Sequence, residues 1–352
     1  MSTPRIEIDL GKIGHNASRL MELYGSRGIG ISAVTKVVCG NPEIAEVLVK
    51  AGIGVLADSR IANIRKMRDA GVEAQFLLLR TPFLSQAESV VKYADLSLNS
   101  DLSVIRELSR FALMQHIKHR IILMVELGDL REGLMPSDVP GTVASILELD
   151  GIELAGIGTN LACFGGIKPD DEKMGQLSLM AKELENEFGL APLIVSGGNS
   201  ANYEWFMSTQ DLGRVNNLRL GESIYLGCET LHRKPIPGLL TDAFTLFAEV
   251  VESSIKPSLP YGEVCQDVSG QIPEFEDLGR IRRAILGIGR QDVLVSGLTP
   301  RAEIDILGAS SDHIIMNTGD MVYIAGDEVA FDLNYGALLS AMTSPYVESM
   351  VI

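Results

Sequence analysis

One lysine lies near the end of a run of small and β-branched residues. The run covers residues 29–38, Lys36 interrupts it, and Cys39-Gly40-Asn41-Pro42 follows. An apolar run of this kind predicts a buried parallel strand, and a proline after it is typical of the first turn of a helix. Because burial makes a lysine amine available for a Schiff base, Lys36 is a candidate nucleophile. The alternative is a lysine that extends past the strand end into solvent.

A second stretch, Ser196-Gly197-Gly198-Asn199-Ser200-Ala201-Asn202, lies between a predicted strand and a predicted helix. Glycines and small hydroxyl residues at such a junction expose backbone N–H groups, and the start of the helix adds its positive dipole. The stretch therefore predicts a phosphate-binding cradle. An ordinary tight turn, with Ser200 as the N-cap of the helix, is the alternative.

A third stretch, residues 218–227, holds Arg219 within an otherwise apolar strand and Gly221 just after it. A guanidinium cannot shed its proton, so Arg219 needs a dedicated partner. Barrels often bind phosphate at the loops after strands seven and eight, where this stretch and the previous one are expected. A salt bridge from Arg219 to Glu222 or Asp211 is the alternative.

Charged residues form a fourth stretch, 126–134, next to the apolar run 121–127. We expect its side chains at the same end of the fold, and a solvated loop is the alternative.

A lysine, a phosphate cradle and a strand-end arginine together indicate pyridoxal phosphate (PLP), which needs an amine, a dianion site and a group facing its ring nitrogen. A nicotinamide cofactor fits less well, because no GxGxxG motif follows a strand and opens a helix.

These stretches belong to a regular alternation of strand-like and helix-like segments. The predicted strands are 29–38, 54–58, 75–79, 94–98, 121–127, 154–160, 193–196 and 215–224. The predicted helices are 42–51, 60–70, 84–91, 101–115, 139–149, 172–188 and 201–208. About eight strand–helix units within roughly 200 residues predict a (β/α)8 TIM barrel with a parallel sheet. An open doubly wound sheet is the alternative.

Beyond residue 238 the pattern changes to short strand-like runs separated by turns. The predicted strands are 244–251, 284–288, 303–307, 314–316, 321–324 and 328–331, and one helix is expected at 335–343. Residues 5–10 alternate apolar and polar, as a further strand does. We therefore expect an α/β chain with a (β/α)8 barrel over 11–232 and a mostly β domain over 233–352, joined by the N-terminal strand 1–10.

Composition limits the functional classes. The chain has 352 residues, 46% of them hydrophobic, and a formal net charge of -16. These values suit a globular enzyme and disfavour both disorder and nucleic-acid binding, which needs a basic surface. No segment approaches the ~20 apolar residues of a membrane span, and the first residues hold no apolar signal core. The cysteines are scattered without a CxxC pair, so we expect a cytoplasmic protein without structural zinc and without a membrane partner.

The chain resembles the alanine-racemase-type (fold type III) PLP-dependent enzymes, and within them it is most similar to the ornithine racemase family. The matching segments span nearly the whole chain and are Arg5-Ile6-Glu7-Ile8-Asp9-Leu10, Thr35-Lys36-Val37-Val38-Cys39-Gly40, Ala57-Asp58-Ser59-Arg60, residues 196–202 and residues 219–227. In this family a (β/α)8 barrel precedes a β domain. The single-domain PLP homeostasis proteins share the barrel alone, so the length of this chain argues against them.

The resemblance implies a role for each candidate residue. Lys36 matches the Schiff-base lysine, Arg219 the arginine that faces the pyridine nitrogen, and Arg131 one that contacts the phenolic oxygen of the cofactor. Phosphate-binding positions are matched by Ser196, Ser200, Gly221, Glu222 (through its backbone) and Tyr346. Related decarboxylases place a glutamate at the ring nitrogen. An arginine there disfavours protonation of the ring, which suits racemisation.

The second catalytic base departs from the family pattern. Alanine racemase has a tyrosine where this chain has Ile288, and Gly158-Thr159-Asn160 occupies the place of an expected histidine. Residues 308–313 match the segment that reaches the active site of the partner subunit. His313 is therefore a candidate base, and Asp312 is either that base or the group that binds a cationic substrate side chain. A purely structural His313 is the alternative.

We therefore expect a PLP-dependent racemase that interconverts the L- and D-enantiomers of a basic amino acid, with ornithine as first candidate, by two-base transfer of the α-proton. The family also implies a homodimer with active sites shared across the interface and a small-molecule amino acid as partner. Racemisation of alanine or of many amino acids is one alternative. A decarboxylase, a lyase or a non-catalytic PLP carrier on the same scaffold is the other.

Overall fold

The computed structural model describes residues 3–266, 270 and 272–352. Two compact units are distinguished: Gly11–Thr241 forms one, and the described residues before and after it form the other. The first unit is a closed parallel barrel with helices, and the second is mostly antiparallel β-sheet. The prediction of a TIM barrel followed by a β domain is confirmed, and the open doubly wound sheet is excluded.

Eight parallel strands close the barrel. They are β2 (Gly30–Val34), β3 (Val55–Asp58), β4 (Gln75–Leu78), β5 (Leu96–Asn99), β6 (His119–Met124), β7 (Ile152–Gly158), β8 (Ile194–Ser196) and β9 (Asn217–Leu220). Each strand pairs with the next, and β2 completes the ring by pairing with β9, where Ser32 lies opposite Arg219. Apolar side chains from β2 to β6 pack together in the core, because both faces of a parallel sheet are buried.

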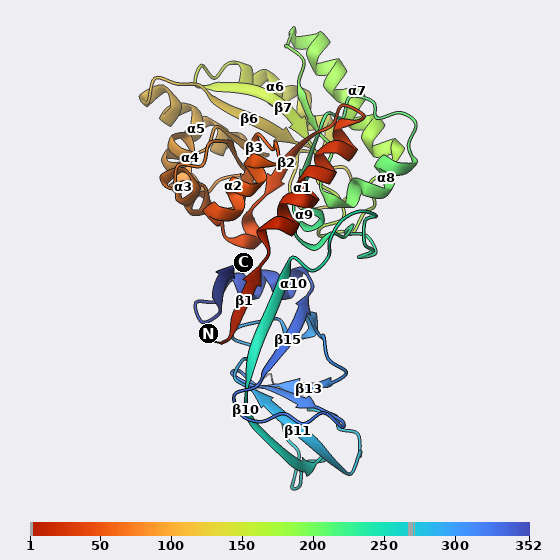
Figure 1. Cartoon of the computed structure of the whole chain (residues 1–352). Helices are drawn as coiled ribbons and strands as arrows, with labels where there is room; N and C mark the ends of the chain where they lie inside the picture. The colour runs from red at the N-terminus through yellow and green to blue at the C-terminus, as the bar shows by residue number, and fades with distance from the viewer. Residues whose placement is uncertain (1–2, 267–269, 271) are drawn as a thin grey trace. The chain divides into compact units, whose positions relative to one another are not determined.

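Helices connect the strands and surround them (Figure 1). In chain order they are α1 (Leu10–Gly25), α2 (Pro42–Lys50), α3 (Ile61–Asp69), α4 (Ala87–Tyr93), α5 (Leu102–Met114), α6 (Val139–Leu147), α7 (Asp171–Phe188), α8 (Tyr203–Ser208) and α9 (Glu222–Leu226). Asn41, Asp101 and Asp170 accept hydrogen bonds from the first backbone N–H groups of α2, α5 and α7. Pro42 lies in the first turn of α2, as the sequence predicts.

The first barrel strand ends earlier than the sequence predicts. β2 stops at Val34, and Lys36–Val38 forms a 3₁₀ turn, η1, so the prediction of a strand through residue 38 is wrong. An apolar run does not distinguish a buried strand from a buried turn. After the turn Gly40 has φ 57°, and a Cβ there would lie 2.8 Å from Asn63 Cβ. Glycine is therefore required, and the chain leaves the strand by a tight, fixed path.

Residues 233–241, which the sequence assigns to the second domain, group with the barrel unit. The reason lies in Asn16, a fully buried residue of α1. Its Nδ2 donates to Ile224 O at 3.0 Å and to Leu240 O at 2.8 Å, and its Oδ1 accepts from Leu240 N at 2.7 Å. A buried amide with these partners holds the connector to the barrel.

The β unit contains strands from both ends of the chain. They are β1 (Arg5–Ile8), β10 (Phe244–Pro257), β11 (Arg280–Leu286), β12 (Leu298–Pro300), β13 (Asp305–Ala309), β14 (Ile314–Asn317), β15 (Glu328–Leu333) and β16 (Glu348–Val351). Helix α10 (Tyr335–Thr343) lies between the last two. β1 pairs antiparallel with β10 and parallel with β16. Residues 321–324, predicted as a strand, form a loop.

A buried polar pair links two neighbouring barrel strands. His119 of β6 is 2% exposed, and its Nε2 lies 2.8 Å from Ser97 Oγ of β5. Desolvation lowers the pKa of His119 to about 4, so the ring is neutral in the folded protein.

The buried His119 predicts a pH dependence of stability. Because its folded pKa lies below that of an unfolded histidine, the unfolded chain binds a proton first as the pH falls. We expect the free energy of unfolding to lose about 2 kcal/mol from this group between about pH 7.5 and pH 5. Urea titrations at both pH values should show a smaller loss for His119→Gln than for the parent protein. Equal losses would contradict a neutral, buried His119.

Candidate active site

Lys36 lies just after the carboxyl end of β2, the end at which barrels place their chemistry. Its side chain is half-buried, and desolvation lowers the pKa of the amine. The charges of Cys163, Asp58 and Glu132 oppose this shift, which places these groups near the amine. Among the described residues, no hydrogen bond or ion pair ends at Lys36 Nζ. The structure therefore brings the Lys36 amine to the barrel mouth without an ion-pair partner in the part of the chain that it describes.

Asp58 fixes the turn that carries Lys36. It ends β3 and is fully buried, and its Oδ2 accepts a hydrogen bond from Thr35 Oγ1 at 2.8 Å. Its Oδ1 accepts from Arg60 N at 2.8 Å and from Asn63 Nδ2 at 3.1 Å. Burial raises the pKa of this carboxyl, and the hydrogen bonds oppose the shift. Since both oxygens are engaged, the main effect of Asp58 is to place the turn.

Arg219 of β9 is buried among neutral oxygens. Its Nη1 donates to Ser196 Oγ at 2.6 Å, and its Nη2 donates to Thr159 O at 2.7 Å and Asn160 Oδ1 at 3.3 Å. Desolvation lowers the pKa of Arg219 to about 10, so the guanidinium stays charged near neutral pH. These contacts connect the carboxyl ends of β7, β8 and β9 through one cation.

The alternative of a salt bridge from Arg219 to an acid is wrong for the described residues. Glu222 forms its ion pair with Arg233, and burial raises the pKa of this carboxyl. Asp211 Oδ1 accepts a hydrogen bond from Gly213 N at 2.8 Å. Arg219 therefore has no carboxylate partner in the part of the chain that the structure describes, and an anionic or electron-rich ligand would suit it.

Small hydroxyl residues gather where β8 and β9 lead into short helical turns. Ser200 Oγ lies 3.0 Å from Ser223 Oγ and accepts a hydrogen bond from Ser223 N at 3.3 Å. A Cβ on Gly221 would lie 3.2 Å from Val34 Cβ, so this glycine lets the second loop approach the end of β2. Both serines are buried, and the first N–H groups of a helical turn lack intrahelical partners. The arrangement fits a phosphate cradle.

Ser196 has a different set of contacts from Ser200. Its hydroxyl donates to Asn217 Oδ1 at 2.7 Å and accepts from Arg219. In this structure Ser196 therefore orients the guanidinium, and its predicted contact with phosphate stays a prediction.

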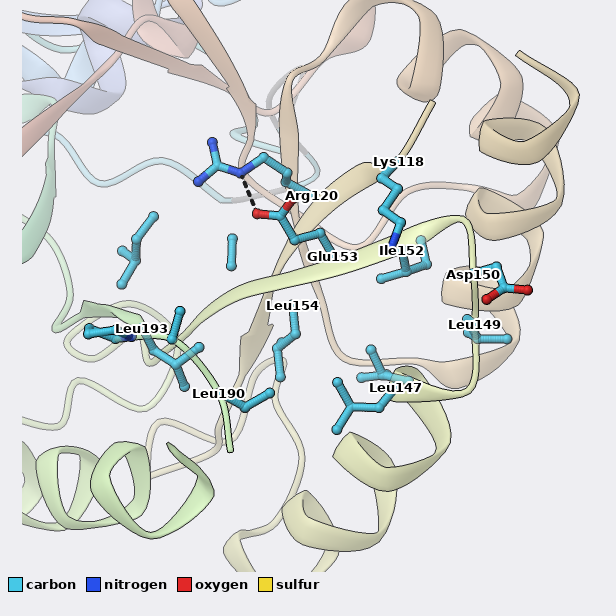
Figure 2. Close-up of a pocket in the computed structure, with 15 residues that line it drawn as sticks. Lys118, Arg120, Leu147, Leu149, Asp150, Ile152, Glu153, Leu154, Leu190 and Leu193 are labelled. Atoms are coloured by element: carbon cyan, nitrogen blue, oxygen red, sulfur yellow. Dashed lines mark hydrogen bonds and ion pairs between the residues drawn. The ribbon is translucent and has the colours of Figure 1, made fainter. Parts of the chain in front are cut away.

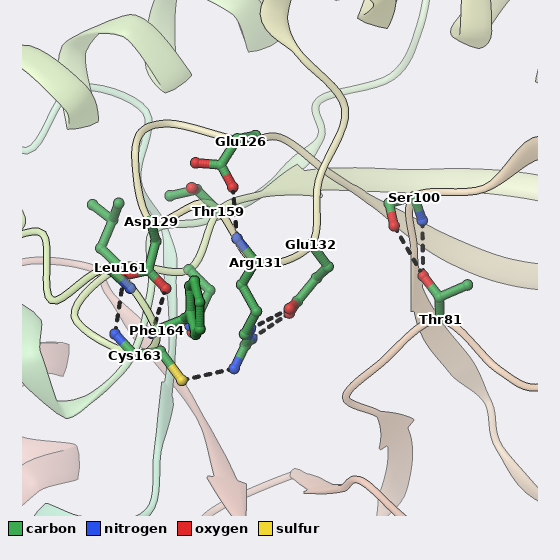
Figure 3. A network of polar contacts seen from close by, with 12 residues as sticks. Thr81, Ser100, Glu126, Asp129, Arg131, Glu132, Thr159, Leu161, Cys163 and Phe164 are labelled. Carbon is green, nitrogen blue, oxygen red and sulfur yellow. Dashed lines mark hydrogen bonds and ion pairs between the residues drawn. The ribbon is translucent and has the colours of Figure 1, made fainter.

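Arg131 lies on the loop after β6, and its guanidinium contacts two neighbours (Figure 3). It forms a bidentate ion pair with Glu132, and its Nη1 donates to Cys163 Sγ at 2.8 Å. Arg131 and Glu132 both interact electrostatically with Lys36 and with Arg219. The structure thus brings the predicted residues Lys36, Arg131 and Arg219 to one end of the barrel.

Asp129 clamps the loop that follows β7. The residue is 1% exposed, and its carboxylate accepts hydrogen bonds from Cys163 N at 3.1 Å, Phe164 N at 2.9 Å and Gly165 N at 3.1 Å (Figure 3). A carboxylate that accepts several backbone N–H groups is fixed in place. Asp129 is therefore a positioning residue for the loop. Sequence reasoning missed Cys163, because only the fold brings the loop after β7 beside Arg131.

The remaining candidates lie in the β unit. Asp312 Oδ1 accepts hydrogen bonds from Ser310 Oγ and Ser311 Oγ, which hold the pKa of this carboxyl below its usual range. His313 Nδ1 lies 3.2 Å from Asp312 Oδ1, and both side chains are exposed. Tyr346 is 69% exposed. The roles predicted for Asp312, His313 and Tyr346 stay predictions.

One pocket lies at the other end of the barrel (Figure 2). It has a volume of about 480 Å³ and is lined by residues at the amino-terminal ends of β6, β7 and β8, such as Lys118, Glu153 and Leu193. Arg120 Nε donates to Glu153 Oε1 at 3.2 Å across it. Chemistry in barrels belongs to the carboxyl ends of the strands, so this pocket is not the candidate active site.

The hydrogen bonds from residues 163–165 to Asp129 predict that this loop becomes more flexible when Asp129 is replaced. In Asp129→Asn the amide N–H₂ faces backbone donors, so at least one hydrogen bond of the clamp is lost. We expect the amides of residues 163–165 to exchange about tenfold faster, equivalent to roughly 1.4 kcal/mol. Hydrogen exchange read by mass spectrometry measures this, with the exposed Asp150→Asn as matched control. Unchanged exchange in both variants would show that Asp129 does not hold the loop.

Comparisons with known proteins identify relatives along nearly the whole chain. An ornithine racemase from Acetoanaerobium sticklandii is 40% identical over 353 aligned residues, which cover 99% of each chain. A lysine racemase from Thermotoga maritima is 39% identical over 352 residues, again with 99% of each chain covered. Both relatives are racemases, a class of isomerase.

Solved structures agree on the fold. An alanine racemase from Clostridium difficile 630 matches with a TM-score of 0.77 and 20% identity, over 100% of this chain and 96% of that chain. One from Corynebacterium glutamicum matches with a TM-score of 0.75 and 18% identity, over 100% of both chains. The family model described as alanine racemase, N-terminal domain, matches residues 8–228, almost the full extent of the barrel. The chain therefore belongs to the alanine racemase family.

Proposed function

We propose that this chain is a PLP-dependent racemase that interconverts the enantiomers of a basic amino acid, with ornithine as preferred substrate. The observation that carries the proposal is the buried Arg219, a cation without a carboxylate partner among the described residues, at the same barrel end as Lys36. Its relatives named ornithine racemase and lysine racemase, both similar over their full length, support a basic substrate.

The residues at the barrel mouth fit PLP. Lys36 would hold the cofactor through its amine, Arg219 would face the ring nitrogen and Arg131 the phenolic oxygen. Phosphate would be held by Ser200, the backbone at Gly221 and Glu222, Ser196 and Tyr346. Two observations support the fit: the hydroxyls of Ser200 and Ser223 converge, and Thr159 Oγ1 is buried without a hydrogen-bond partner in the described chain. When bound, PLP supplies the electron sink for breaking the Cα–H bond.

Arg219 favours racemisation over other reactions. Its charge near neutral pH opposes a second positive charge on the ring nitrogen that it would face. The electron sink is then weaker than one with a carboxylate at that position, which limits decarboxylation and other side reactions. A decarboxylase on this scaffold is therefore disfavoured.

Lys36 would move the α-proton on one face of the substrate. Its amine has a lowered pKa and no bound partner among the described residues, so it can accept and return a proton. The two faces of the substrate require two groups for inversion. His313 and Asp312 of the partner subunit are the sequence-based candidates for the other face.

Recognition of the basic side chain requires an acid with a vacant acceptor. Asp129 is buried and both of its carboxylate oxygens accept backbone hydrogen bonds, and Glu222 is buried and paired with Arg233, so both are poor candidates for this role. Asp312 is exposed, and its lowered pKa keeps it anionic. We assign this role to Asp312 of the partner subunit, which implies a homodimer that shares its active sites.

No helix of the described chain is long and apolar enough to cross a membrane. As part of the proposal, the enzyme acts in the cytoplasm on a small-molecule amino acid.

Chiral chromatography tests the proposed function. The PLP-loaded protein is incubated with single enantiomers of ornithine, lysine, arginine and alanine, and each product mixture is resolved. We expect both enantiomers of ornithine and lysine, and little conversion of alanine, which has no side-chain charge to pair. Faster racemisation of alanine would favour the alanine or broad-specificity alternative. Amine or aldehyde products would indicate a decarboxylase or lyase, and no conversion at all would indicate a PLP carrier.

Removal of the Lys36 amine tests how the cofactor is held. We expect Lys36→Ala to lose the visible absorption band of covalently bound PLP and to lose racemisation, because both need this amine. Lys50→Ala, at an exposed position of α2, is the matched control and should retain both. A full absorption band in Lys36→Ala would mean that another lysine holds the cofactor.

A further inference from the structure

We propose that Cys163 is the group that moves the α-proton on the face of the substrate opposite Lys36. This inference rests on the proposed function and deepens it, because the base that family resemblance predicts is absent. Ile288 occupies that position, is fully buried and cannot accept a proton.

Cys163 is held in place by contacts on both its backbone and its side chain. Asp129 accepts a hydrogen bond from its backbone N–H at 3.1 Å, and Arg131 Nη1 donates to its sulfur at 2.8 Å (Figure 3). A Cβ on Gly165 would lie 2.7 Å from Asp129 O, so the loop packs tightly against its clamp. The residue is nevertheless exposed in the single chain. A fixed thiol that a ligand can reach is what proton transfer requires.

The groups near Lys36 can be compared for their capacity to accept a proton. Desolvation is the largest influence on the pKa of Lys36, and the charge of Cys163 is the next. Asp58 is fully buried, and both of its carboxylate oxygens accept hydrogen bonds. Both oxygens of Glu132 accept hydrogen bonds from Arg131 Nε and Nη2. Arginine is always protonated and offers no acceptor. Cys163 is therefore the remaining candidate among these neighbours.

A second observation concerns the end of β7, the strand that precedes the loop of Cys163. Thr159 directly follows β7 and is fully buried, and its Oγ1 has no hydrogen-bond partner within the described residues. Its backbone oxygen accepts from Arg219. A buried hydroxyl without a hydrogen-bond partner, in the residue whose backbone oxygen binds Arg219, suggests that a polar ligand supplies the missing partner. Cys163 lies on the loop that leaves this position.

The proton transfer balances without a further reactant. With PLP bound as the electron sink, the unprotonated sulfur of Cys163 would take the proton as the Cα–H bond breaks, which would form an S–H bond. Lys36, protonated, then delivers a proton to the opposite face of Cα, and the reverse direction exchanges the two roles. Arg131 Nη1 donates to the sulfur at 2.8 Å and so fixes its position.

The test follows isotope exchange and inversion separately. L-ornithine and D-ornithine are each incubated with PLP-loaded protein in deuterium oxide, with α-deuterium read by mass spectrometry and inversion by chiral chromatography. In Cys163→Ser, we expect racemisation to fall by roughly 10²–10⁴-fold. One enantiomer, the one that Lys36 deprotonates, should still exchange its α-proton without inversion. Serine keeps the acceptor for Arg131 but is a far weaker proton carrier, and Cys265→Ser is the matched exposed control.

A readout that does not measure racemisation accompanies this test. Before the cofactor is added, iodoacetamide should alkylate Cys163 and Cys265, as peptide mass mapping records. Loading with PLP and ornithine should protect Cys163 alone, because only that thiol faces the substrate. Alkylation of Cys163 that is unchanged by PLP and ornithine would overturn the proposal.

Two further outcomes would overturn it. One is racemisation by Cys163→Ser at the parental rate. The other is a His313→Ala variant in which only one enantiomer exchanges its α-proton, while Cys163→Ser racemises normally. That result would assign the second base to His313 of the partner subunit. If the parent protein racemises none of the amino acids, the proposed function itself fails, so the two failures are distinguishable.

Discussion

A guanidinium buried without a carboxylate is the constraint on which the rest of the site depends. Arg219 cannot become neutral by losing its proton near neutral pH, so its desolvation must be offset by oriented oxygens. Ser196 and Thr159 supply them from the ends of β8 and β7, and neither lies near Arg219 in the sequence. The parallel order β7-β8-β9 brings these groups together, and the pairing of β9 with β2 closes the barrel beside the strand that precedes Lys36.

The carboxylates of the barrel mouth act mainly on the backbone. Asp58 holds the turn that carries Lys36, and Asp129 holds the loop that carries Cys163. Glu132 is paired with Arg131 and Glu222 with Arg233. Because the acids are used in this way, Lys36 and Arg219 have no anionic partner among the described residues. A cofactor with a carbonyl group for the Lys36 amine and a ring nitrogen that accepts a hydrogen bond from Arg219 would suit both. Rigid support of this kind is what precise proton transfer needs.

Much of the fold was predictable because hydrophobic periodicity reports burial directly. The alternation of strands and helices, and the place of Lys36 and Arg219 at strand ends, follow from local patterns. The end of β2 did not, since Thr35 leaves the strand to reach Asp58, a contact made only in the fold. The role of Asp129 was not predictable, because the backbone amides that it accepts from come more than thirty residues later in the chain. The place of Cys163 beside Arg131 was not predictable for the same reason, because the two residues are far apart in the sequence.

In the proposed function, Lys36 is the residue that would bind PLP covalently. Borohydride reduction of PLP-loaded protein, followed by peptide mass mapping, tests it most directly, because reduction makes a carbon–nitrogen link permanent. The account predicts one phosphopyridoxyl group, on the peptide that contains Lys36, and its loss when an ornithine enantiomer is present in excess to displace the lysine. A label on another lysine, or no label at all, would contradict the account.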